Sequence, residues 1–200
     1  MEFAEALQRR RSTRSFLDTP VEQQLIREVL AASLRAPSAG NTWALSMLVL
    51  TQAARERYWS TTMSPAVRSR FRWQGLFNAP VLIVVMTDPQ RYPQRYSEPD
   101  KVSTGLGDGS HAWPIPYWYV DAGAAIQSML LCAGAVGLDS LLFGAFGHEP
   151  ALKRQFEIDP HQRIVGVIAL GYGDDSSRLA GRSASRVRPP LQDFVTSLES

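Results

Sequence analysis

The apolar run Val81–Met86 (VLIVVM) constrains the fold of this chain more than any other feature. Turn-forming residues bound it, with Asn78-Ala79-Pro80 before the run and Asp88-Pro89 after it. A strand with one face in water alternates apolar and polar residues, whereas a continuous apolar run is typical of a strand that is covered on both faces. The sequence therefore predicts a central strand in a sheet that has helices on both sides.

Other segments repeat their apolar residues at helix or strand spacing. One helix is expected to begin with Thr19 as its N-cap, Pro20 at its first position and Glu22 closing a capping box. It should end before Pro37, and its apolar face is formed by Leu25, Ile26, Val29, Leu30 and Leu34. The remaining expected elements are helices at 3–9, 53–76 and 150–156 and strands at 46–51, 141–143 and 164–170.

The segment Tyr117–Val136 is apolar over nearly the length needed to span a bilayer. Asp121, Gln127 and Ser128 interrupt it, and it lacks cationic flanks. It is also rich in glycine and alanine, which permit close packing of helices. These features favour a buried central helix over a membrane span.

Composition limits the classes of function. The net charge of +2 is too small to predict nucleic-acid binding, and a single cysteine, Cys132, excludes a disulfide scaffold or a multi-cysteine metal site. The start of the chain lacks the basic and then apolar pattern of a signal peptide. We expect one domain spanning residues 1–200, located in the cytoplasm and bound neither to nucleic acid nor to a membrane.

Arginines make up 19 of the 21 basic residues and gather near the two ends of the chain. The first group is Arg9, Arg10, Arg11 and Arg14, and the second is Arg178, Arg182, Arg186 and Arg188. Guanidinium groups bind phosphate oxygens bidentately, and the Ser12 hydroxyl would add a further donor. The two groups could meet on one bound phosphate, or they could form a solvated basic surface.

Two further segments combine turn residues with ligand-binding potential. In Ala36–Asn41 (APSAGN), a hydroxyl and an amide suit the edge of a heterocycle, although such residues also form ordinary turns. In Leu142–Gly147 (LFGAFG), glycines after a strand allow a ligand to approach the backbone, or simply turn the chain.

Taken together, these segments resemble the FMN-dependent nitroreductase family. The resemblance rests on the RRSxRxF pattern at Arg10–Phe16, the APSxxN pattern at Ala36–Asn41, Gly144-Ala145-Phe146 after a strand, and a basic element before a proline-leucine-acid tail at Arg186–Asp193. Two departures stand out. Trp43-Ala44-Leu45 replaces the common Gln-Pro-Trp, and 70–75 lacks the usual asparagine and lysine, with Gln74 as a stand-in.

The resemblance implies a role for each matching residue. Arg10, Arg11, Ser12 and Arg14 would hold the FMN phosphate and the pyrimidine edge, and Arg186 and Arg188 would close on that phosphate. Backbone amides at Gly144 and Ala145 would face flavin N5. A loop of the second subunit would add Pro37, Ser38 and Asn41.

The fold implied by the resemblance is α+β, with a mainly antiparallel central sheet flanked by helices in an intertwined homodimer, and residues 187–200 crossing to the partner. The implied activity is ping-pong reduction of an electron-poor small molecule, such as a nitroaromatic or quinone, by NAD(P)H. The protein itself needs no catalytic side chain or metal, because the flavin carries the chemistry. Two alternatives are a flavin dehydrogenase or oxidase of a peptide-derived heterocycle, similar to azoline dehydrogenases, and a non-catalytic flavin-binding protein.

The segment 88–116 holds five prolines and three glycines, so we expect it to lack regular structure and to lie over the flavin as a lid. Its aromatic side chains offer flat surfaces for planar acceptors. The candidate substrate contacts are His111, Trp113 and Tyr117.

Overall fold

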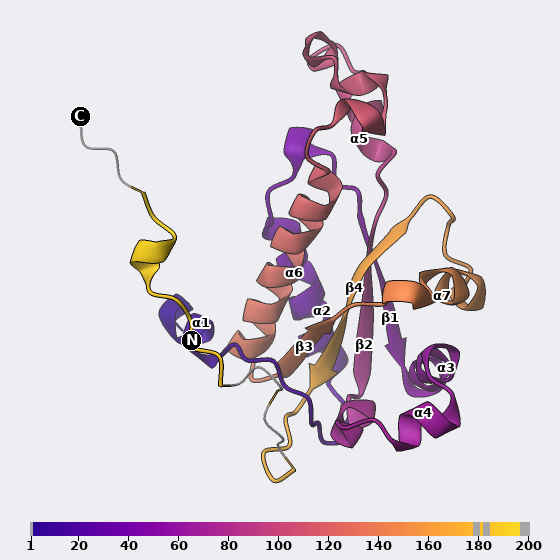
Figure 1. The fold of residues 1–200 in the computed structure, drawn as a ribbon, viewed down its shortest axis with the longest axis vertical. Helices are drawn as coiled ribbons and strands as arrows, with labels where there is room; N and C mark the ends of the chain where they lie inside the picture. Colours follow the sequence, from indigo (N-terminus) through magenta and orange to yellow (C-terminus); the bar gives the residue numbers. More distant parts are fainter. Residues whose placement is uncertain (1, 178–180, 182–184, 197–200) are drawn as a thin grey trace.

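The computed structural model describes residues 2–177, 181 and 185–196. Four antiparallel strands form one sheet in the order β1-β2-β4-β3 (Figure 1). The strands are β1 (Leu45–Thr51), β2 (Val81–Thr87), β3 (Asp139–Phe143) and β4 (Arg163–Gly171). Every residue of β2 is buried, which confirms the central strand expected from the apolar run.

Helices cover both faces of the sheet. On one face, α2 (Gln23–Ala32) and α6 (Tyr117–Ala135) pack against alternate residues of the central strands, including Ile83 and Ile168. On the other face, α3 (Gln52–Thr62) and α7 (Glu149–Phe156) enclose Leu82 and Val84. Strand side chains alternate between faces, so the continuous apolar run fills two cores. The fold is α+β, as expected.

The long apolar segment forms α6 and buries Met129 and Ala133 completely against the sheet. Its apolar composition is therefore explained by core packing. Among the described residues, no helix is long and apolar enough to cross a membrane.

The start of α2 differs from the expectation. The helix begins at Gln23 with Glu22 at the N-cap and no side-chain cap, so the capping box at Thr19 is wrong. The backbone upstream is tied to the sheet, because Phe16 N donates to Gly75 O at 3.0 Å and Leu17 N to Tyr172 O at 2.9 Å. These bonds tie the chain to the sheet as far as Leu17, and the helix begins only at Gln23.

The expected helix over 53–76 is also wrong, because the chain forms three separate elements. They are α3, α4 (Pro65–Ser69) and a 3₁₀ turn at Gln74–Asn78. Ser64 accepts a hydrogen bond from Val67 N, and Pro65 occupies the first turn of α4. Serine and proline at these positions start a new helix rather than continue the old one.

Segment 88–116 is more regular than expected. It contains α5 (Arg91–Tyr96), followed by 3₁₀ turns at Val102–Thr104, Leu106–Asp108 and Ser110–Ala112. Tyr92 and Trp113 of this segment pack with Ala44, just before β1, and with Trp118 of α6 in a small core that anchors the segment. In Figure 1 it stands at the top, at the opposite end of the sheet from α1 (Phe3–Arg9) and the segment that follows α1.

Candidate functional site

The segment Arg10–Phe16 is fixed along one end of the sheet. Ser12 bridges to Ser140 of β3, and Thr13 N donates to Ser140 O at 3.0 Å. Phe16 is buried and bridges to Gly173, just beyond β4. The backbone of the motif thus follows the sheet edge while the Ser12 side chain stays exposed.

Asp139, the first residue of β3, accepts hydrogen bonds from three donors in this region. Its Oδ1 accepts from Arg11 Nε at 3.1 Å and from Thr13 Oγ1 at 2.9 Å, and its Oδ2 accepts from Gly173 N at 3.2 Å. Arg11 Nη2 also donates to Asp175 at 2.9 Å. The hydrogen bond to Asp139 raises the pKa of Arg11. Arg11 therefore faces two carboxylates, unlike its expected role beside a phosphate.

Arg14 and Gly144, far apart in sequence, line one pocket of about 300 Å³. The Arg14 guanidinium lies 5.3 Å from the ring centroid of Trp73, and its Nη1 donates to Ser12 O at 3.2 Å. The remaining walls are largely apolar or aromatic: Tyr58, Trp59, Thr62, Met63, Phe71, Leu76, Leu141, Leu142, Phe143, Phe146 and His148. The pocket thus combines one cation with flat apolar surfaces.

Gly144 and Ala145 follow β3 directly, and Ala145 is buried. A Cβ on Gly144 would lie 2.6 Å from the Phe146 ring, which is itself 88% exposed. The Phe146 ring therefore packs closely over Gly144, and a larger residue there would require this exposed ring to move. A glycine lets a planar group approach the main chain at the pocket wall.

Gln74, the expected stand-in for flavin-contacting residues, lies outside the lining of this pocket. Its Nε2 donates to the carbonyls of Arg68 at 2.8 Å and Phe71 at 2.7 Å. The side chain therefore closes the local turn before β2.

The loop 36–43 adopts an unusual backbone. Gly40, Asn41 and Trp43 all have positive φ, at 62°, 57° and 50°. Trp43 N donates to Ser38 Oγ at 3.1 Å, and Trp43 Nε1 donates to Asn41 Oδ1. Ser38 and Asn41, two of the expected cofactor contacts, thus help to fold their own loop. Pro37 lies between them and the end of α2.

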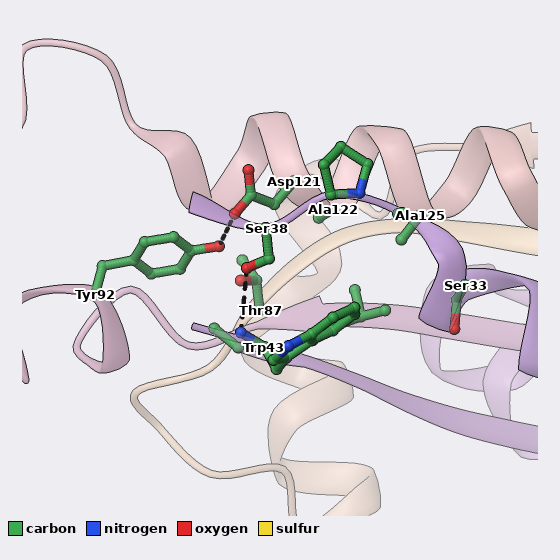
Figure 2. A pocket seen from close by; sticks show the side chains of 12 residues that line it. Ser33, Ser38, Trp43, Thr87, Tyr92, Asp121, Ala122 and Ala125 are labelled. Atoms are coloured by element: carbon green, nitrogen blue, oxygen red, sulfur yellow. Dashed lines mark hydrogen bonds between the residues drawn. The ribbon is translucent and has the colours of Figure 1, made fainter. Parts of the chain in front are cut away.

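A small cavity of about 20 Å³ lies behind this loop, as Figure 2 shows. Asp121 of α6 accepts from Tyr92 Oη at 2.7 Å and from Ala39 N at 2.8 Å. Ser38 and Trp43 line the same cavity from the loop side. Burial and the bond to Asp121 raise the pKa of Tyr92, which keeps its hydroxyl a donor.

The two motif regions lie at opposite ends of the sheet. The loop enters β1 at Leu45, which pairs with Thr87, whereas Asp139 beside the first motif pairs with Gly171. At about 3.3 Å per residue, the length of β1 separates these ends by roughly 20 Å. One chain therefore does not bring Arg14 and Asn41 onto the same small ligand.

The three expected substrate contacts differ in exposure. Trp113 is buried, and its Nε1 donates to Leu106 O at 3.0 Å, so it is a core residue of segment 88–116. His111 is exposed, and Tyr117 is 40% exposed. Tyr117 lines an apolar pocket of about 430 Å³ with Ala39, Tyr96, Leu106, Trp113, Pro114 and Ile115.

Arg186 and Arg188 are exposed in a segment that runs past α1 and away from the sheet (Figure 1). Arg178 and Arg182 lie outside the described residues. The expected convergence of the two arginine groups on one phosphate remains a prediction.

Sequence reasoning did not identify Asp139, Tyr92 or the function of Asp121. Asp121 carried one signal, since it interrupts an otherwise apolar helix. Its partners are 82 and 29 residues away in the chain, so its bonds were not visible from local sequence.

Comparisons with known proteins agree with this architecture. A protein from Archaeoglobus fulgidus, named as a candidate NADH dehydrogenase/NAD(P)H nitroreductase, is 30% identical over 83% of this chain and 82% of its own length. Chloronitrobenzene nitroreductase from Comamonas testosteroni is 25% identical over 94% of this chain and 92% of its own.

An FMN-dependent nitroreductase from Clostridium difficile has the same fold, with a TM-score of 0.65 at 20% identity over 92% of this chain and 97% of that one. The model of the nitroreductase family matches residues 7–172, most of the described chain. The chain belongs to the nitroreductase family of oxidoreductases.

Proposed function

We propose that this protein is an FMN-dependent oxidoreductase that takes electrons from NAD(P)H and passes them, in a ping-pong cycle, to an electron-poor small molecule such as a nitroaromatic or quinone. Membership of the nitroreductase family supports the flavin chemistry. The names of the relatives support the reductant and the acceptor class, and the name of the Clostridium difficile protein supports FMN.

The observation that carries the proposal is the pocket shared by Arg14 and Gly144. Its aromatic and apolar walls fit a planar ring system, and the guanidinium of Arg14 fits an anionic group attached to that ring. Gly144 has no side chain of its own, so a flavin ring that displaces the exposed Phe146 ring would reach the main chain at the wall. One cation beside flat apolar walls supports a ligand that joins a planar ring to an anionic group, as a flavin mononucleotide does.

Within this proposal, Arg10, Ser12 and Arg14 bind the FMN phosphate, and Gly144 and Ala145 orient the ring through their backbone. Arg11 has a supporting role, because its ion pair with Asp139 anchors the motif to β3. When bound, FMN supplies the redox chemistry, since its ring exchanges two electrons with the nicotinamide and with the acceptor. The protein provides orientation and charge.

We propose a homodimer in which each flavin contacts both subunits. The separation of the loop 36–43 from Arg14 supports this, because Pro37, Ser38 and Asn41 then serve the flavin of the partner. The C-terminal arm (residues 187–200) crosses to the partner and brings Arg186 and Arg188 near the phosphate. The described part of the arm exposes apolar side chains, which packing against a second subunit would bury: Val187, Leu191, Phe194 and Val195.

The acceptor then binds beside segment 88–116, with His111, Trp113 and Tyr117 around it. The exposed apolar pocket at Tyr117 and Ile115 supports this position, since it offers a flat hydrophobic surface near the loop 36–43.

Purification and anaerobic titration test the proposal. The protein should copurify with, or bind, FMN in preference to riboflavin, and NADH or NADPH should bleach the bound flavin within seconds. An added nitroaromatic should then restore the oxidised spectrum. A flavin that neither nicotinamide reduces would overturn the reductase and favour a dehydrogenase or a carrier, and absence of FMN binding would overturn the whole proposal.

A further inference from the structure

Side chains on one face of α5 contact the loop 36–43. Tyr92, Arg95 and Tyr96 are spaced so that they share this face. Arg95 Nε donates to Gly40 O at 2.8 Å. The Tyr96 ring lies directly beside Gly40, where a Cβ would come within 2.6 Å of it. The helix therefore contacts the loop at its most sharply turned residue.

Asp121 completes this arrangement from the side of α6 (Figure 2). One oxygen, Oδ2, accepts both Tyr92 Oη and Ala39 N, so a single carboxylate joins α5, α6 and the loop. Tyr92 is buried, and its ring packs against Trp113 in the small core of segment 88–116. The Tyr92 side of this contact is therefore buried, while Asp121 and Ala39 are partly exposed.

The loop needs outside support because its backbone is strained. Asn41 and Trp43 are non-glycine residues in the left-handed region, which persists only where surrounding contacts impose it. Within the loop, Trp43 bonds to Ser38 and Asn41, and Thr42 Oγ1 donates to Ala39 O. Asp121 and Arg95 hold Ala39 N and Gly40 O from outside the loop. Removal of the outside contacts should release the strained conformation.

We propose that Asp121 and Tyr92 are positioning residues for the cofactor: they hold the loop Ser38–Asn41 in the strained conformation that presents Asn41 to the flavin. This inference rests on the proposed function. It also means that segment 88–116, which we place beside the acceptor, contacts the loop 36–43 and supports its conformation. Changes in that segment therefore alter flavin binding as well as acceptor choice.

Hydrogen exchange on the full-length apoprotein tests whether Asp121 and Tyr92 hold the loop in its conformation. Asp121→Asn should accelerate exchange of the amides of Ala39–Trp43 by at least about tenfold, and Tyr92→Phe should have a smaller effect in the same direction. The control Asp159→Asn changes a carboxylate that accepts from His161 N and, among the described residues, has no hydrogen bond to the loop 36–43, so it should leave the loop unchanged. Unaltered loop exchange in both variants would overturn the proposal. Tyr92→Phe removes one hydroxyl only, so it keeps the test available if Asp121→Asn does not fold.

A double-mutant cycle on FMN affinity tests whether Asp121 affects flavin binding through Asn41. Asp121→Asn should weaken FMN binding roughly tenfold in the wild-type background, but less than about twofold in an Asn41→Ala background, since it acts through Asn41. The flavin absorption spectrum should shift in the single variant and not in Asp159→Asn. Additive losses would assign Asp121 a merely structural role and overturn the inference. A wild-type protein that binds no FMN would overturn the proposed function, while the exchange result would still stand.

Discussion

Two aspartates at opposite ends of the sheet each bind one motif region. Asp139 binds the first region (Arg10–Phe16), and Asp121 binds the second region (the loop 36–43). Asp139 belongs to β3 and binds a segment whose backbone already pairs with the sheet at Ser12 and Phe16. Asp121 belongs to α6 and binds a loop that makes its outside contacts through side chains of α5 and α6. The first region is thus part of the sheet, and the second is held against it.

This difference has a consequence for how the two regions tolerate change. The first region depends on strands that form the core of the domain, so disturbance there spreads to global stability. The second depends on α5, whose segment packs in a small core around Trp113 that is separate from the two cores of the sheet. A change there can open locally and leave the sheet intact.

The largest expected effect is the loss of FMN affinity when Arg14, the cation at the pocket beside the first region, is removed. Arg14→Ala removes the guanidinium from the pocket, and a charge-assisted hydrogen bond contributes about 1.5–3 kcal/mol. FMN affinity should therefore fall roughly 10- to 100-fold, with little change for riboflavin, which lacks the phosphate. Calorimetric titration of both flavins measures this. The matched control Arg57→Ala removes an exposed arginine of α3, and equal losses for FMN and riboflavin would contradict the assignment.

Asp139→Asn tests whether the first region is coupled to the whole fold. The ion pair to Arg11 is partly exposed and contributes little, but Thr13 and Gly173 lose a charged acceptor. The free energy of unfolding should fall by about 1–3 kcal/mol. Denaturant titration measures it, with Asp159→Asn as the comparison. A stability equal to that of the control would show that the edge pairing alone anchors this segment.

The outcome of sequence reasoning follows the same division. The runs at Val81–Met86 and Tyr117–Val136 predicted a central strand and a buried helix because their signals are local and strongly apolar. The predicted N-cap at Thr19 was wrong: α2 begins at Gln23, after a stretch that Phe16 and Leu17 tie to distant residues of the sheet. Ser64-Pro65 is a local helix-start signal that the expected helix over 53–76 did not take into account.

At the site, motif order predicted functional segments that contain Arg14, Gly144, Ser38 and Asn41, and the structure places Arg14 and Gly144 at one pocket. It did not show that Arg11 faces Asp139, because a row of arginines gives no information on which one meets a carboxylate. Pairings over such distances are set by the fold rather than by local spacing.

Gly40→Ala tests the second region and should have a local effect. The left-handed φ of 62° and the Tyr96 ring both oppose a Cβ, at a cost of about 1–2 kcal/mol. We expect the loop to open, with faster exchange at Ala39–Trp43 and FMN binding several-fold weaker. The thermal midpoint should change less than in Asp139→Asn. A larger loss of global stability than in that variant would reverse the contrast between the two regions.

The smallest expected effect concerns the surface that segment 88–116 offers to an acceptor. Trp113→Ala would remove a buried ring that packs on Tyr92, so it would disturb the loop as well and could not separate acceptor binding from flavin binding. Ile115 is a cleaner probe, because it lines the apolar pocket yet is 54% exposed. Ile115→Ala should leave the fold and FMN affinity unchanged.

The KM for a nitroaromatic acceptor should then rise about three- to tenfold, since the loss of a few contacting carbons is worth about 1 kcal/mol at a partly exposed site. The rate of flavin reduction by the nicotinamide should stay the same, because that half-reaction does not use the acceptor surface. Steady-state and anaerobic stopped-flow kinetics separate the two. Val67→Ala, at an exposed position on α4, is the matched control. If Ile115→Ala changed FMN affinity and left KM alone, this surface would belong with the loop that α5 holds rather than with the acceptor.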